Sequence, residues 1–243
     1  MDSGIVLKSE SCRSMQGLVK MRVSLYDKGS LVKQTVMGLT DYISMLQRSV
    51  KKEEAPTTLM VGEIPQGFVD GAVSDIPGTL GAIIYIPPQK RQFLLDESGE
   101  RKKAAYFMPM PGLVYMCVSN RGNIHTFRCY VFKEWEGDNT RLYHYPFGNV
   151  SDNGSICMGS VKKVKISGFM DIRKNIEQSL TAVTNRDYLD SDLCRTSVTV
   201  TQHELCDQVS KVDEFPSEIL LENTELPTVK DLKQEFRNIL TTL

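Results

Sequence analysis

The stretch YHYPFGNVSDNGSICMGS, residues 143–160, is rich in turn-forming residues and contains one cysteine, Cys157. Its proline, glycines and asparagines fix φ or readily take a positive φ, so the stretch cannot continue a strand or a helix. It follows the longest strand-like region of the chain and precedes a part with helical periodicity. We therefore expect a long, ordered surface loop that presents one thiol.

The spacing within this loop carries a resemblance. Asn149 lies eight residues before Cys157, as in the active-site segment of ubiquitin-conjugating (E2) enzymes, where a His-Pro-Asn triplet precedes a Gly-x-Ile-Cys-Leu run. Phe147 and Gly148 occupy the places of that family's His and Pro. A Tyr-x-x-Pro-aromatic-x-Asn-Val approach to a Gly-x-x-Cys-x-Gly run is similar to the prokaryotic branch of the superfamily, prokaryotic E2 family D or PRTRC system protein B.

The N-terminal third of the chain predicts a hairpin followed by a helix. Apolar residues alternate on both sides of the turn at residues 27–30, which predicts a β-hairpin over residues 17–36. Thr40 and Asp41 offer an N-cap before apolar residues at helical spacing, so a helix is expected over residues 40–50. Residues 51–58 are charged and include a proline, as in a linker. Residues 59–75 are apolar but interrupted by glycine and proline, and predict irregular structure or short strands.

The middle of the chain predicts a sheet, and the end predicts helices. Five apolar or alternating runs separated by turn residues are expected as strands, at residues 81–87, 92–96, 104–108, 112–119 and 123–132. Strands joined in sequence by short turns favour an antiparallel meander with one face on helices. Periodicity predicts amphipathic helices over residues 170–184 and 226–243, and a possible strand over residues 195–201.

This order of elements is that of the ubiquitin-conjugating fold, and the resemblance to the prokaryotic branch extends over residues 19–160. The expected fold is therefore α+β and UBC-like, an antiparallel β-meander packed against helices. We expect residues 76–243 to form this core with its C-terminal helices. Residues 1–75 should be an N-terminal extension, made of the hairpin and the helix and packed on the core, because so short a segment is marginal as a separate domain.

The composition of the chain indicates which kinds of binding partner and which cellular compartment to expect. The chain has 243 residues, of which 41% are hydrophobic and 24% charged, and a net charge of −1. This balance favours neither nucleic acid nor an anionic membrane surface. There is no apolar run of about 20 residues and no signal-peptide pattern at the N-terminus, so we expect a cytoplasmic protein with six cysteine thiols. Cys194, His203 and Cys206 lack a fourth zinc ligand, so we expect no metal site.

The resemblance implies that Cys157 is the thioester nucleophile and that Asn149 supports the loop or the oxyanion. A thiolate suits acyl exchange, because it is nucleophilic and its thioester stays reactive. Alternatively, Cys157 is a small core residue and Asn149 an Asx-turn residue. Lys162 and Lys163 would favour the thiolate if they turn toward it. Three residues could assist the incoming amine: Ser155, Asp152 and Ser160. His144 is more simply explained as a residue that braces the loop. Cys117 and Cys129 lie on expected strands and are expected to be core residues.

The resemblance implies a carrier enzyme, an E2-like acyltransferase of a bacterial ubiquitin-like conjugation pathway. Its expected partners are an E1- or ThiF-like activating enzyme, a ubiquitin-like protein ending in glycine, and a JAB-type deconjugating metalloprotease. No cofactor is expected, since the activating enzyme uses the ATP. Two alternatives stay open. One is a non-catalytic E2-like scaffold in a plasmid-maintenance or antiphage defence assembly, and the other is an unrelated cysteine hydrolase, which the absence of a nearby His or Asp dyad disfavours.

Overall fold

The structure is a computed structural model that describes residues 5–13, 19–27, 30–38, 63–74, 76, 78–97, 102–189 and 193–243. The chain divides into two compact units, Met1–Thr57 and Thr58–Leu243. The first unit contains an antiparallel sheet in the order β1-β2-β3, formed by β1 (Ile5–Arg13), β2 (Val19–Asp27) and β3 (Ser30–Gly38).

The predicted N-terminal hairpin is confirmed as β2 and β3, which pair antiparallel with Asp27 opposite Ser30. Strand β1 was not predicted, although its nine residues pair with β2 along their whole length. The predicted helix over residues 40–50 lies outside the described residues. That residues 1–75 pack on the core stays a prediction.

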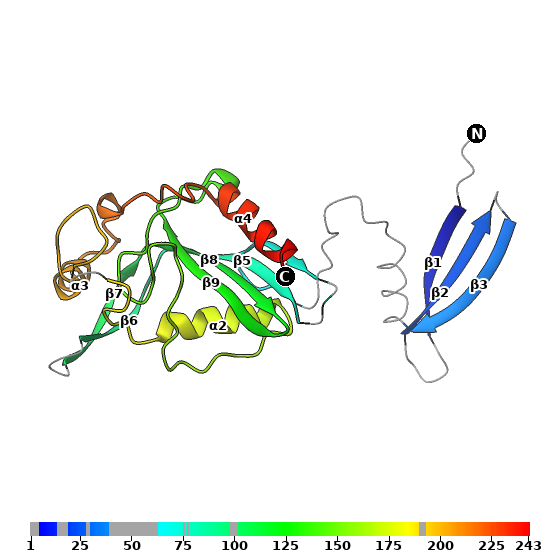
Figure 1. The fold of residues 1–243 in the computed structure, drawn as a ribbon, viewed down its shortest axis with the longest axis horizontal. Coiled ribbons are helices and arrows are strands. Elements are labelled where there is room, and N and C mark those ends of the chain that lie inside the picture. Colours follow the sequence, from blue (N-terminus) through cyan, green and yellow to red (C-terminus); the bar gives the residue numbers. More distant parts are fainter. Residues whose placement is uncertain are drawn as a thin grey trace. The chain divides into compact units, whose positions relative to one another are not determined.

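The second unit is built on a four-stranded antiparallel sheet in the order β4-β5-β8-β9. Its strands are β4 (Phe68–Val73), β5 (Leu80–Ile86), β8 (Gly112–Asn120) and β9 (Asn123–Phe132). The long apolar runs of β5 and β8 are explained by burial on both faces. Figure 1 shows α2 (Phe169–Thr181) in yellow and α4 (Val229–Thr241) in red on opposite sides of these strands.

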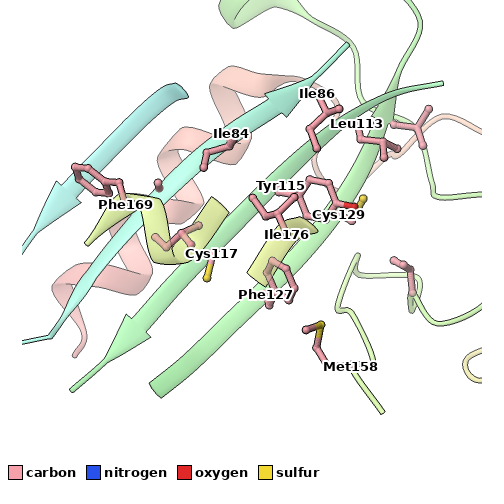
Figure 2. Packing of buried hydrophobic residues seen from close by; sticks show 14 of the residues in the cluster. Ile84, Ile86, Leu113, Tyr115, Cys117, Phe127, Cys129, Met158, Phe169 and Ile176 are labelled. Atoms are coloured by element: carbon pink, nitrogen blue, oxygen red, sulfur yellow. The ribbon is translucent and has the colours of Figure 1, made fainter. Parts of the chain in front are cut away.

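Side-chain alternation along β8 assigns each face to one helix. Tyr115 and Cys117 join the cluster that contains Phe169, Ile172 and Ile176 of α2. The intervening β8 residues join Phe236 and other α4 residues in a second cluster; they are Val114, Met116 and Val118. Figure 2 shows the α2 side of the sheet, where Ile84, Tyr115 and Cys129 surround Ile176. The sheet is thus a central layer between two helical layers.

The prediction of a meander, in which each strand pairs with the next strand along the chain, was wrong in one respect. β6 (Gln89–Glu97) and β7 (Lys102–Met110) form a separate two-stranded sheet, and β5 pairs directly with β8. Pro87 and Pro88 follow β5 and Pro111 follows β7. Because proline donates no backbone hydrogen bond, these residues end the ladders and let the β6–β7 hairpin leave the main sheet. The turn between β6 and β7 was predicted over residues 96–99, of which residues 98 and 99 lie outside the described residues.

The C-terminal half confirms two predicted helices and adds a third. α2 and α4 occupy the predicted regions, shortened at their ends. The predicted strand over residues 195–201 is wrong: Thr201 instead caps α3 (Gln202–Val209), in a reciprocal capping box with Glu204. Two 3-10 turns complete the described elements, η1 (Gly137–Asn139) and η2 (Ser217–Ile219). Within the described part of the chain, no helix has the length and apolar composition that a membrane crossing requires.

Candidate active site

The loop that carries Cys157 is fastened along the outer edge of β9. The backbone N–H of Ile156 donates to the carbonyl of Phe127 at 3.0 Å, and the N–H of Cys129 donates to the carbonyl of Gly154 at 2.9 Å. Gly154 has φ 80°, and a Cβ there would lie 2.7 Å from the ring of Tyr130. The loop therefore lies close against a buried aromatic ring, and only glycine fits at this turn.

Cys157 is half-buried, whereas Cys117, Cys129, Cys194 and Cys206 are buried. Its backbone N–H donates to the carbonyl of Asn149 at 2.8 Å. Burial raises the pKa of Cys117 and of Cys129 to about 12, so these two thiols stay protonated. Cys117 and Cys129 are confirmed as core residues, whereas Cys157 is more accessible than either.

Asn149 ties this loop to the segment that follows α2. Its side-chain Nδ2 donates to the carbonyl of Val183 at 2.8 Å, and its Oδ1 accepts from the backbone N–H of Asn185 at 3.0 Å. Its own N–H donates to the carbonyl of Asp187 at 2.9 Å. The residue has φ 65°, a conformation that asparagine tolerates better than most residues. Asn149 thus has a clear loop-holding role, and its role at an oxyanion stays a prediction.

The segment after α2 is itself fixed by β6. Thr184 donates its N–H to the carbonyl of Leu94 at 2.7 Å and accepts from the N–H of Asp96 at 2.8 Å. This short parallel bridge extends the β6–β7 sheet by one residue. It holds the backbone of residues 182–187 against the thiol loop, so the separate hairpin has a structural role at the site.

Asp187 is the site residue that the sequence did not predict. Its Oδ2 lies 3.8 Å from Sγ of Cys157, and it accepts from Nδ2 of Asn185 at 3.0 Å. Its N–H donates back to Oδ1 of Asn185 at 2.8 Å, which closes an Asx turn. The carboxylate is exposed and held in place beside the sulfur. The Asn-x-Asp pattern at residues 185–187 predicts a turn and was the available signal in the sequence. Whether this turn lies near Cys157 in space depends on the length of α2, which the pattern does not give.

The residues that were expected to assist an amine are described by other contacts, and that role stays a prediction. Asp152 is exposed and pairs with Nε of Arg195 at 2.6 Å, and Arg195 also donates to the carbonyl of Val150. Ser155 bridges to Arg128 of β9 through its backbone, and Ser160 is exposed. These residues brace or border the loop, while the carboxylate beside the thiol belongs to Asp187.

The structure also describes the lysine and histidine residues that the sequence analysis considered. Lys162 and Lys163 are exposed. His144 is half-buried and its backbone N–H donates to the carbonyl of Leu221 at 2.9 Å, which fits a loop-bracing residue. Nδ1 of His203 lies 2.7 Å from the hydroxyl of Tyr106. Over the described residues, no group of three or more His, Cys, Asp or Glu side chains is arranged to hold a metal ion.

The substituted triplet has a structural explanation. Phe147 is fully buried and its ring lies 4.6 Å from that of Phe93. Gly148 donates its N–H to Oε1 of Gln202 at 3.0 Å, and a Cβ at Gly148 would lie 1.8 Å from the carbonyl oxygen of Asn185. A proline at this position would lose the hydrogen bond and clash with the backbone. Phe147 and Gly148 therefore follow from the way the loop packs on β6 and α3.

Comparison with protein families identifies a matching family. The family model described as Prokaryotic E2 family D matches residues 60–222. The chain belongs to this family. Comparison with curated proteins gave no match, and comparison with solved structures gave none either. The predicted membership of the prokaryotic E2 branch is thereby confirmed, and the matched region spans the sheet, the thiol loop, α2 and α3.

Membership of the prokaryotic E2 family suggests an E2-like function. Antiparallel strands packed with helices, as described above, are compatible with an E2-like α+β fold. The matched residues 60–222 include Asn149, Cys157 and Asp187, and end before α4.

Proposed function

We propose that the protein is an E2-like carrier that holds a ubiquitin-like protein as a thioester on Cys157. The observation that carries the proposal is the half-buried thiol of Cys157 with the carboxylate of Asp187 at 3.8 Å, in a chain of the prokaryotic E2 family. A thiol with a carboxylate neighbour suits acyl transfer to an amine, since the carboxylate can take the proton that the amine loses.

In the first step, the Cys157 thiolate attacks the thioester carbonyl on the activating enzyme. The new S–C bond forms at Cys157, and the activating enzyme's cysteine leaves as a thiolate. ATP is used earlier, by the activating enzyme, so this subunit requires no cofactor of its own. Because a thiolate replaces a thiolate, the exchange needs no general base on the carrier.

In the second step, an amine of the target attacks the thioester carbonyl on Cys157. The C–N bond forms, Cys157 leaves as a thiolate, and the amine nitrogen loses one proton. Asp187 is the group that we assign to accept this proton, because its Oδ2 lies beside Sγ and is exposed to an incoming amine. Asn149 holds the two segments that carry these groups together, through Val183 and Asn185.

The main argument for a non-catalytic scaffold was the substituted triplet, and the packing around Gly148 offers another explanation for it. The substituted triplet had suggested a lost activity, but the close approach of Asn185 requires glycine there for a packing reason. The hydrolase alternative needs an imidazole to activate the thiol. The side chain placed beside Sγ is a carboxylate instead.

The test is mass spectrometry of the full chain after incubation with an activating enzyme of the same pathway, the ubiquitin-like protein and ATP. Wild type should gain one ubiquitin-like protein in an adduct that reducing thiol removes. Cys157→Ser should give an ester that resists reducing thiol, and Cys157→Ala should give no adduct. Cys194→Ala changes a buried cysteine and should charge like wild type. Equal charging of Cys157→Ala and wild type would reject Cys157 as the carrier.

A further inference from the structure

A small cavity lies beneath the thiol loop, between β6, the main sheet and the end of α2. Its volume is about 30 Å³. A single water needs roughly 10–15 Å³ of accessible space, so the cavity has room for one or two groups of that size. Eight residues with polar or thiol side chains line it: Arg91, Tyr115, Cys129, Tyr145, Asn149, Cys157, Ser179 and Thr184.

The charge in this cavity is unbalanced. Arg91 uses Nη2 to donate to the carbonyl of Leu180 at 3.1 Å, whereas Nη1 is buried and has no hydrogen-bond partner among the described residues. None of the described residues that line the cavity is an aspartate or a glutamate. A buried guanidinium N–H without an acceptor is strongly unfavourable, so its position calls for a missing counter-charge.

The neighbouring hydroxyl and thiol groups cannot supply that charge. Burial raises the pKa of Tyr115, and it raises the pKa of Tyr145 as well. Burial likewise raises the pKa of Cys129, which also lines the cavity, to about 12. All three groups are therefore neutral at physiological pH. The carbonyl of Leu180 is a neutral acceptor, so the net charge of the lining is positive when Cys157 is a neutral thiol or a thioester.

We propose that this cavity binds one small monovalent anion of halide size, with Arg91 as its counter-charge. Arg91 lines the cavity and has Nη1 available as a charged donor, and Tyr145 lines the same space. Gln178 also has a buried oxygen without a partner, but it does not line the cavity. The proposal concerns the protein alone, so it stands independently of the carrier function.

Bromide provides a direct test, because its anomalous scattering separates it from water. Crystals of the full chain soaked in bromide should show an anomalous peak in the cavity within hydrogen-bond distance of Arg91 Nη1. Crystals of Arg91→Met should lose this peak, and Arg91→Lys should keep it at lower occupancy. A wild-type cavity that holds only water in saturating bromide would overturn the proposal.

Thermal unfolding provides a second test in solution. An anion that binds only the folded state raises the melting temperature. Wild type should melt at a higher temperature in chloride than in gluconate of equal ionic strength, since gluconate is too large for the cavity. Arg91→Met should lose this difference. If Arg91→Met does not fold, Tyr145→Phe keeps the charge and removes one donor, which should weaken halide binding roughly 3–10-fold. Identical wild-type melting in both salts would contradict an anion site.

Discussion

Oδ2 of Asp187 lies 3.8 Å from Sγ of Cys157, although the two residues are 30 positions apart in the chain. Two independent links produce this proximity. Asn149 joins the thiol loop to Val183 and Asn185, and Thr184 joins the same segment to β6. The arrangement makes Asp187 part of the site by tertiary structure rather than by sequence position.

The first prediction concerns Asp187→Asn, which keeps the size of the side chain but removes the proton acceptor. The variant should still charge, while single-turnover discharge of its thioester onto lysine should slow by about 10²-fold, the lower range for a positioned base. Raising the pH should recover part of the rate, because more of the amine is then unprotonated. Asp207→Asn, an exposed aspartate on α3, is the matched control. If Asp187→Asn discharged at the wild-type rate, Asp187 would only close the turn with Asn185.

The second prediction separates the two roles of Asn149. Asn149→Gly removes both side-chain hydrogen bonds but accepts the positive φ, so it should lower the free energy of unfolding by about 1–3 kcal/mol. Asn149→Ala should lose about 1 kcal/mol more, because alanine is strained at φ 65°. Both variants should still charge and should discharge ~100-fold more slowly, if the side chain also stabilises the oxyanion. Loss of charging in both variants would instead make Asn149 purely a loop-holding residue.

Local patterns predicted much of this fold. Strands β5, β8 and β9 are apolar or alternating runs, α2 and α4 repeat apolar residues at helical spacing, and the turn residues around Cys157 mark the loop. The eight residues of α3 are too few for a clear period, and their signal was the capping box of Thr201 and Glu204. Strand β4 is short and broken by Gly71, so the sequence left it between irregular structure and a strand.

Long-range relationships could not be predicted in this way. The pairing of β5 with β8 across the β6–β7 hairpin depends on where prolines end the ladders, and both orders satisfy the same local pattern. Of the candidate site, Cys157 and Asn149 were identified by the resemblance of their loop to that of E2 enzymes. Asp187 was not, because its place depends on the 13 residues of α2 and on the bridge at Thr184.

The third prediction concerns pH and the start of α2. The hydroxyl and the N–H of Ser167 donate to Asp171, and with Lys174 they lower the pKa of this carboxyl from 3.8 to about 2. A lowered pKa in the folded state adds stability above the unfolded-state pKa, and this contribution is lost as the pH falls toward the folded value. Wild type should therefore be more stable than Asp171→Asn at neutral pH, and the difference should shrink between pH 3.8 and about 2. Urea unfolding of both proteins over this range measures it, and a difference that does not change with pH would contradict the assignment.

The last prediction concerns Gly148, where packing rather than φ requires glycine. The Cβ of Gly148→Ala would lie 1.8 Å from the backbone oxygen of Asn185, and a backbone atom cannot move aside as a side chain can. We expect a loss of about 1–3 kcal/mol in the free energy of unfolding. The displaced Asn185 should also weaken its bond to Asn149 and slow discharge from Cys157.

Two further variants complete this test. Gly159→Ala is the control: this glycine is exposed, nothing lies within 4 Å of its Cβ position, and only its φ of 50° opposes alanine, at about 1 kcal/mol. Gly148→Pro would restore the proline of the related E2 triplet, yet it would also remove the hydrogen bond to Gln202, so it should be less stable than Gly148→Ala. If Gly148→Pro were as stable as wild type and discharged faster, the substituted triplet would be a loss of activity rather than a consequence of packing.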